Sequence, residues 1–279
     1  MEASTLKKEV IKKEEKKEDE KENPNQGKRI DQADTKHATA IPESSSEKLY
    51  NSIVKINVDL KEKEFKTGTG FFISPIINKK IRYFLMTCQH VIMEEFVEKK
   101  KNISLYYGKR KEEKKIEIRL DRNKRYIKCF KEPLDVTLIE ILDKDNIKKD
   151  KFLEPDLNYK NKKGYAFYVD NDCYLAGYPQ NKERSVSSGK ISKILEEKVE
   201  FEHSLDAKGG NSGSPICLSN NLLVVGIHKQ GHETKPINYG TFFGYILDNL
   251  EREEEEKKDE KNSSNEIKQK KKKWKWKRI

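Results

Sequence analysis

The sequence predicts an all-β protein built as barrels or sandwiches, and three observations carry this prediction. About a dozen short apolar runs are separated by turn residues, and helical periodicity is nearly absent between them. The runs form two groups of similar size on either side of a polar linker at residues 143–163. Regular short strands without intervening helices favour barrels or sandwiches over alternating strand–helix units.

The first group of runs begins with a clear strand pattern. Val54, Ile56, Val58 and Leu60 alternate with polar residues, which is the period of a half-buried strand. The other runs of this group are residues 70–73, 83–86, 103–107, 116–120, 126–130 and 136–142.

The second group predicts a similar number of strands and a closing helix. Its runs are residues 165–169, 174–178, 190–195, 199–201, 215–218, 222–227 and 241–247. Phe243, Ile246, Leu247 and Leu250 stand at helical spacing, and residues 251–258 are good helix formers. We therefore expect a short C-terminal helix.

The charge of the chain is concentrated at its two ends. Charged residues make up 38% of the sequence, and residues 1–47 and 251–279 contain long Lys/Glu runs with few apolar residues. Such segments bury too little apolar surface to offset the entropy of ordering. We expect a disordered tail at 1–47, a folded domain at 48–250, and a charged helix end with a basic Trp/Lys tail at 251–279.

Cysteine usage and hydropathy predict a cytoplasmic or nuclear protein. No run approaches the ~20 apolar residues of a membrane span, and the N-terminus lacks the apolar region of a secretory signal. Cys88, Cys129, Cys173 and Cys217 are scattered, without the paired spacing of a zinc site. We expect reduced thiols, no metal and no cofactor.

Three polar residues have neighbours suited to nucleophilic catalysis. Ser212 lies in Gly-Gly-Asn-Ser-Gly-Ser-Pro, residues 209–215, where small residues let backbone amides approach a reacting carbonyl. His90 follows an apolar run, and Asp135 directly precedes another. Taken singly, a loop like that of Ser212 is more often a plain turn, a histidine like His90 is more often structural, and an aspartate like Asp135 is more often a turn residue or a cap. Together they offer a nucleophile, a base and an acid that orients the base.

Four segments resemble the trypsin-like (chymotrypsin-fold) serine peptidases, whose triad follows the same chain order of His, Asp and Ser. Residues 87–91, Thr-Cys-Gln-His-Val, resemble the family's Thr-Ala-x-His segment. Residues 134–138, Leu-Asp-Val-Thr-Leu, resemble Asp-Ile-Ala-Leu, and residues 210–215, Gly-Asn-Ser-Gly-Ser-Pro, resemble Gly-Asp-Ser-Gly-Gly-Pro. Residues 68–73 match the glycine-rich early strand. The resemblance covers residues 48–250.

This resemblance implies two six-stranded antiparallel β-barrels, at about 48–145 and 160–250, with the active site between them. It implies a serine endopeptidase that acts on protein or peptide substrates through an acyl-enzyme. His90, Asp135 and Ser212 would form the triad, and the amides of Gly210 and Ser212 the oxyanion hole. The alternative is a catalytically silent binding or scaffold protein that has kept the fold.

The residues around the nucleophile depart from secreted trypsins. Those enzymes carry an aspartate before the serine, which pairs with a newly cut N-terminus. Asn211 has no charge for this pair, so we expect no activation by N-terminal insertion.

Substrate preference stays open between two classes of P1 residue. Asp206 matches the position where a carboxylate binds Lys or Arg in trypsins. Residues 226–228, Gly-Ile-His, instead resemble the glutamyl endopeptidases, in which the residue matched by His228 helps to bind Glu. The Gly-Asn-Ser-Gly-Ser-Pro form also belongs to that branch, and it favours an acidic P1 residue slightly.

The C-terminal segment is strongly basic. Residues 268–278 contain lysines interleaved with Trp274 and Trp276, and they contribute to the net charge of +11. This composition suits an acidic partner, either nucleic acid or a membrane surface, or a solvated tail.

Overall fold

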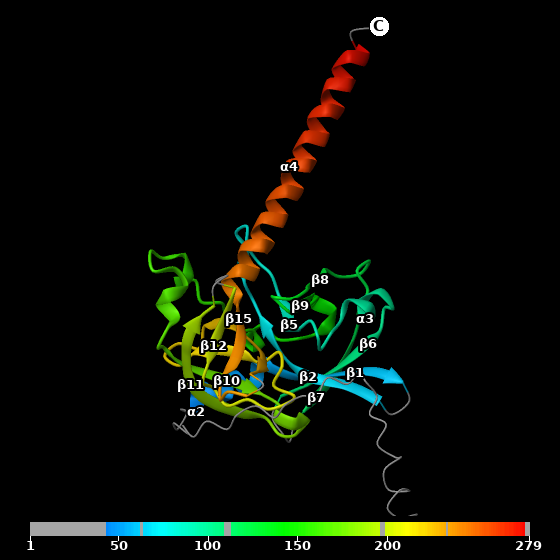
Figure 1. Cartoon of the computed structure of the whole chain (residues 1–279). Helices are drawn as coiled ribbons and strands as arrows, with labels where there is room; N and C mark the ends of the chain where they lie inside the picture. The colour runs from blue at the N-terminus through cyan, green and yellow to red at the C-terminus, as the bar shows by residue number, and fades with distance from the viewer. Residues whose placement is uncertain (1–42, 62–63, 109–112, 196–198, 233, 277–279) are drawn as a thin grey trace, which may run out of the picture. The chain divides into compact units, whose positions relative to one another are not determined.

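Strands β10 to β15 pair in antiparallel fashion and close into a barrel in the order β10-β11-β12-β15-β14-β13 (Figure 1). The protein was examined as a computed structural model, which describes residues 43–61, 64–108, 113–195, 199–232 and 234–276. The barrel strands are Asp172–Gly177 (β10), Ser185–Ile194 (β11), Glu200–His203 (β12), Pro215–Leu218 (β13), Val224–Gly231 (β14) and Asn238–Phe242 (β15). We call this unit barrel two.

The N-terminal half forms a seven-stranded antiparallel sheet in the order β7-β6-β1-β2-β5-β9-β8, which we call barrel one. Its strands are Ile53–Lys61 (β1), Glu64–Ile73 (β2), Phe84–Cys88 (β5), Asn102–Tyr107 (β6), Lys114–Arg119 (β7), Ile127–Phe130 (β8) and Val136–Glu140 (β9). A separate two-stranded hairpin joins Ile76–Ile77 (β3) and Lys80–Ile81 (β4).

The first half differs from the predicted six-stranded barrel. β7 and β8 form opposite edges of its sheet, and within the described residues no pairing joins them, so this sheet is an open half-barrel. Residues 120–126, which connect the two edge strands, form turns rather than a strand. The predicted all-β fold and the closed six-stranded second barrel are confirmed.

One predicted strand is wrong. Residues 165–169 lie mainly in a 3₁₀ helix, Gly164–Tyr168, rather than in a strand. Tyr165 stacks on Tyr159 and on Phe242, at centroid distances of 5.3 and 4.5 Å. Aromatic residues are typical of strands, but they bury equally well from a short helix against a barrel wall.

In the described residues, three α-helices accompany the strands: Glu43–Ser52 (α2), Glu94–Glu98 (α3) and Phe243–Trp276 (α4). α2 includes residues 43–47, which we had assigned to the tail, and residues 1–42 lie outside the described residues. α4 begins where the sequence predicts a helix and extends through the charged segment to Trp276. The abundant Glu and Lys of this segment are good helix formers, which accounts for its length.

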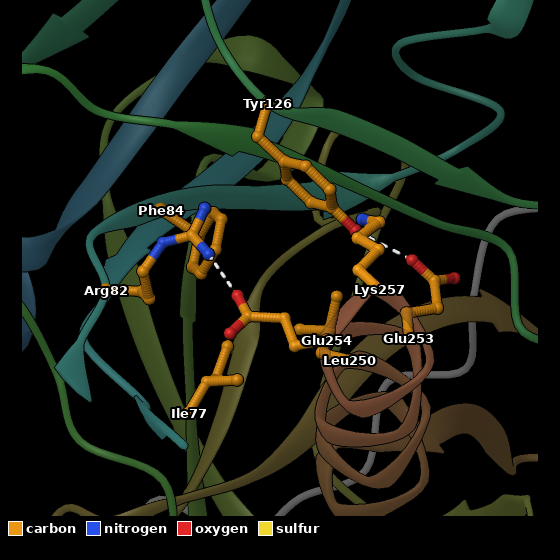
Figure 2. Close-up of a pocket in the computed structure, with 8 residues that line it drawn as sticks. All are labelled: Ile77, Arg82, Phe84, Tyr126, Leu250, Glu253, Glu254 and Lys257. Carbon is orange, nitrogen blue, oxygen red and sulfur yellow. Dashed lines mark hydrogen bonds and ion pairs between the residues drawn. The ribbon is translucent and has the colours of Figure 1, made fainter. Parts of the chain in front are cut away.

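The first turns of α4 connect the two barrels. Phe243, Ile246, Leu247 and Leu250 follow the last strand of barrel two and are buried in a core cluster that contains the interior of barrel one together with Val224 and Ile227 of barrel two. Figure 2 shows polar contacts one turn further along α4. Glu254 forms an ion pair with Arg82 at 2.5 Å, and the Tyr126 hydroxyl donates a hydrogen bond to Glu253 at 3.2 Å. Partly exposed pairs of this kind contribute little to stability, so the apolar stripe is the main anchor.

None of the helices in the described part of the chain has the length and apolar character needed to cross a membrane.

Replacing one residue of the α4 stripe tests this anchor. Ile246 is fully buried, so Ile246→Ala is expected to lower the free energy of unfolding by about 2–5 kcal/mol through the cavity it leaves. The neighbouring Tyr245 is 39% exposed, and Tyr245→Ala is expected to change stability by less than about 1 kcal/mol. Urea denaturation of both variants measures the difference; equal losses would show that α4 is not anchored through this stripe.

Candidate active site

The pairing of β5 with β9 brings His90 and Asp135 together. Cys88, the last residue of β5, lies opposite Val136, the first residue of β9. His90 therefore comes two residues after one strand, and Asp135 one residue before the other. Asp135 accepts two hydrogen bonds from His90: its Oδ1 from the backbone amide at 2.8 Å and its Oδ2 from Nδ1 at 2.5 Å.

This two-point contact fixes the orientation of the imidazole ring. Asp135 is 2% exposed, and its backbone is left-handed with φ 52°, a conformation that aspartate tolerates better than most residues. The backbone amide of Gln89 donates to its carbonyl oxygen at 2.9 Å. A carboxylate beside Nδ1 favours the proton on that nitrogen, which leaves Nε2 of His90 as the proton acceptor.

Ser212 lies in the tight loop between β12 and β13. The amide of Asn211 donates to the carbonyl of Lys208, and the amide of Ser214 donates to that of Asn211, both at 2.9 Å. Gly213 has φ 92°, and a Cβ on it would collide with the carbonyl oxygen of Thr69. Glycine is therefore required immediately after Ser212.

Thr69 of β2 holds this loop from barrel one. Its hydroxyl donates to the carbonyl of Gly210 at 2.7 Å and accepts from the amide of Tyr178 at 3.0 Å. Its own amide donates to the carbonyl of Ser212 at 3.0 Å. The sequence pointed to the glycines on either side of Thr69 but gave its side chain no role. The hydroxyl between two glycines is the signal that could have identified it.

The backbone amides on either side of Asn211 are among those of the loop that have no acceptor. Neither Gly210 nor Ser212 donates its N–H to any residue in the described ranges. The carbonyl of Gly209, by contrast, accepts from the amide of Gln180. Because the N–H of a trans peptide points opposite to its C=O, this bond directs the N–H of Gly210 away from Gln180.

The loop and the histidine segment meet at Gly68. A Cβ on Gly68 would lie 2.7 Å from the side chain of Val91 and 3.3 Å from the carbonyl oxygen of Ser212. Val91, which follows His90, and the backbone carbonyl of Ser212 therefore both lie against Gly68. No hydrogen bond between Ser212 Oγ and His90 is formed within the described residues.

His228 is buried behind the site and pairs with a second histidine. Its Nδ1 lies 3.1 Å from Nε2 of His203, and both side chains are fully buried. Burial lowers the pKa of His203 to about 3, and burial together with His203 lowers the pKa of His228 well below its ordinary value. Both imidazoles are therefore neutral near pH 7.

Asp206 lies in the same loop as Ser212, three residues after His203. It is half-buried, and its carbonyl accepts a hydrogen bond from Ser187 Oγ at 2.7 Å. Both candidate specificity residues thus belong to barrel two.

Cys88, His90 and Asp135 have the residue types and the proximity of a metal site. Their ligand atoms lie within 4.8 Å of one another. Each atom already has a partner, however, because the Cys88 thiol donates to the carbonyl of His228 at 3.2 Å and Asp135 binds His90 with both oxygens. Burial and then Asp135 raise the pKa of Cys88 well above its usual range, which disfavours the thiolate that a metal would need.

Comparisons with known proteins agree with this arrangement. Residues 68–227, more than half of the chain, match the family model described as a trypsin-like peptidase domain. No curated protein matches the chain by sequence.

Three solved structures illustrate the shared fold. The serine endoprotease from Yersinia pestis is 15% identical with a TM-score of 0.53, over 76% of this chain and 68% of that chain. The active form of the Rv3671c protease from M. tuberculosis is 16% identical with a TM-score of 0.52, over 78% and 91%. Deg5 is 15% identical with a TM-score of 0.52, over 73% and 89%.

The family match therefore includes β2 from Gly68 onward, the strands next to His90 and Asp135, the Ser212 loop and β14 as far as Ile227. This chain belongs to the trypsin-like peptidase domain family.

Proposed function

We propose that this protein is a serine endopeptidase that acts through His90, Asp135 and Ser212. The observation that carries the proposal is the two-point hydrogen bond from His90 to Asp135, formed beside the Ser212 loop. An acid that holds an imidazole in this way sets its tautomer and stabilises the imidazolium formed during acyl transfer. Family membership supports the same reaction class.

In the proposed mechanism, Ser212 Oγ attacks the carbonyl carbon of the substrate while His90 Nε2 takes the hydroxyl proton. The free amides of Gly210 and Ser212 stabilise the oxyanion. His90 then gives its proton to the leaving amine, and an acyl-enzyme remains on Ser212. Water then attacks the acyl-enzyme while His90 takes its proton, and this hydrolysis restores the free serine.

The missing hydrogen bond between Ser212 and His90 is compatible with this mechanism. Catalytic hydrogen bonds are often long or poorly aligned in the absence of substrate and tighten when it binds. A silent scaffold protein would share the fold but would not activate the serine.

Covalent labelling separates the two functions. A fluorophosphonate probe is expected to label the full-length protein, and Ser212→Ala should abolish labelling because it removes the nucleophile. His90→Ala should slow labelling by roughly 10⁴-fold, since the proton acceptor is lost. Mass spectrometry after digestion locates the label. A folded wild-type protein that stays unlabelled would contradict the proposal and favour the scaffold.

We further propose that the P1 site prefers an acidic residue, as in the glutamyl endopeptidases. The amide of Leu205 donates to His203 Nδ1 at 3.3 Å, so the His203 proton lies on Nε2 and is donated to His228 Nδ1. The proton of His228 then lies on its own Nε2. That atom is buried and has no partner among the described residues. A buried donor without an acceptor is costly, and a side-chain oxygen of the substrate would satisfy it.

Matched peptides test this preference. Peptides that differ only in Glu or Arg at P1 are expected to be cleaved with a kcat/KM at least roughly tenfold higher for Glu. The free energy of one hydrogen bond to an ionised group corresponds to about this ratio. His228→Phe should remove the preference, whereas Asp206→Asn should leave it intact. Faster cleavage after Arg, abolished by Asp206→Asn, would assign the trypsin-like specificity instead.

The histidine pair also predicts a loss of stability in acid. The pKa values of His203 and His228 are lowered in the folded state, so the unfolded chain binds more protons below pH ~6.5. The contribution of His203 is fully present above that pH and declines as the pH falls toward 3, and at pH 5 its loss is about 2 kcal/mol. The lowered pKa of His228 acts in the same direction.

Urea denaturation at pH 7 and pH 5 measures this loss. His203→Gln is expected to reduce the difference between the two pH values, whatever its effect at pH 7. The matched control is His232→Gln, a half-buried histidine outside the pair. An unchanged pH difference in His203→Gln would mean that the pair does not titrate on unfolding.

A further inference from the structure

Lys229 is a buried cation at the junction of the two barrels. It lies in β14 directly after His228, and its side chain is only 2% exposed. Its ammonium group donates to Glu132 Oε2 at 2.8 Å, to the carbonyl of Pro133 at 2.6 Å and to Glu200 Oε1 at 2.5 Å. Lysine is almost never buried to this extent unless it is paired.

The partners of Lys229 keep it charged. Burial alone lowers the pKa of an ammonium group, but the hydrogen bonds to Glu132 and Glu200 outweigh burial and raise the pKa of Lys229. The three donor hydrogens thus have three acceptors. Two of these acceptors belong to consecutive residues of barrel one, and the third belongs to β12 of barrel two.

The two acceptors in barrel one, Glu132 and Pro133, lie three and two residues before Asp135. The next carbonyl in the chain, that of Leu134, is also held from barrel two, because Thr241 Oγ1 donates to it at 2.8 Å. Thr241 lies in β15, opposite Ile227 of β14, so Lys229 and Thr241 come from paired strands. Barrel two therefore holds both residues that precede Asp135.

The backbone of Asp135 needs such support. Pairing of β5 with β9 fixes the backbone from Val136 onward, but Asp135 itself has a left-handed backbone. Non-glycine residues keep this conformation only where surrounding contacts enforce it. The carbonyl of Asp135 is held within barrel one by Gln89, and those of Pro133 and Leu134 are held from barrel two.

We propose that Lys229 and Thr241 are positioning residues, which hold the Asp135 carboxylate in register with His90 from the barrel that carries Ser212. The inference rests on the proposed function, since its consequence is a rate. On this proposal, the triad is complete only when barrel two packs onto residues 132–134, because strand pairing within barrel one does not by itself fix the Asp135 carboxylate.

Three substitutions test the proposal in the full-length protein. Lys229→Met removes the ammonium, Thr241→Val removes a hydroxyl at nearly constant volume, and Glu132→Gln changes a carboxylate that is 69% exposed. We expect kcat to fall by roughly 10²-fold in Lys229→Met, the size of effect caused by a misplacement of about 1 Å. Thr241→Val and Glu132→Gln should cause smaller losses of kcat. KM should stay nearly unchanged in all three, because the substrate contacts are intact.

A spectroscopic measurement follows the proposed contact itself. The proton shared by His90 Nδ1 and Asp135 gives a downfield proton resonance, which can be recorded in a Ser212→Ala background without turnover. We expect the resonance to weaken or shift when Lys229→Met or Thr241→Val is added. This readout reports on Asp135 even if the protein cleaves nothing.

Arg125→Met is the matched control. Arg125 is also a buried cation that binds a carboxylate and a carbonyl, those of Asp145 and Glu140, but it does not contact the 132–135 segment. This variant is expected to lower the melting temperature while kcat and the downfield resonance of the folded protein stay unchanged. If kcat falls as much in Arg125→Met as in Lys229→Met, the loss is caused by general destabilisation and the proposal is wrong.

The outcomes separate the two proposals. Absence of labelling in the wild-type protein would defeat the proposed function, and the resonance would still decide the role of Lys229. If the wild type is active and Lys229→Met and Thr241→Val keep both kcat and the resonance, the positioning role is wrong. If Lys229→Met does not fold, Thr241→Val and Glu132→Gln decide by the same criteria.

Discussion

The hydrogen bonds between Thr69 and the Ser212 loop are the interaction on which the geometry of the site depends. Through one residue, β2 of barrel one binds the carbonyls of Gly210 and Ser212 and the amide of Tyr178, all in barrel two. The amides of Gly210 and Ser212, which the proposed mechanism uses, belong to residues whose carbonyls Thr69 fixes. The same contact leaves no room for a Cβ on Gly213. Close approach of the two barrels therefore determines the residue types around Ser212.

Apolar and polar contacts between the barrels serve different purposes. Val224 and Ile227 of barrel two belong to the same core cluster as the interior of barrel one, and this buried surface supplies most of the stabilisation. Apolar contact is non-directional, however, and would tolerate small shifts between the barrels. The hydrogen bonds of Thr69 and Lys229 are directional, and they restrict the relative position of the Asp135 and Ser212 segments.

The sequence was most informative where function depends on neighbours in the chain. Short motifs predicted His90, Asp135 and Ser212 because each stands next to a local sequence signal, and the structure brings His90 and Asp135 into hydrogen-bond contact. Lys229 carried no such signal, since its partners are 29 and 97 residues away. A lysine in a Lys-rich chain is normally solvated, and only the fold shows that this one is buried. Thr69 and the 3₁₀ helix at Gly164–Tyr168 were missed for the same reason: tertiary packing decides them.

The charges around the site follow from the same packing. Cys88 lies next to Asp135, but burial and that carboxylate raise the pKa of its thiol, so it adds no second negative charge beside His90. His228 is close enough to His90 to be affected by its charge, and its lowered pKa keeps it uncharged. Its carbonyl accepts from both Cys88 and Gly213, which ties the histidine segment to the nucleophile loop through β14. Cys88 and His228 therefore add no charge near the His90–Asp135 pair. Lys229 holds the segment before Asp135, and the two glutamates that it binds more than offset its positive charge, so its ammonium does not cancel the charge of Asp135.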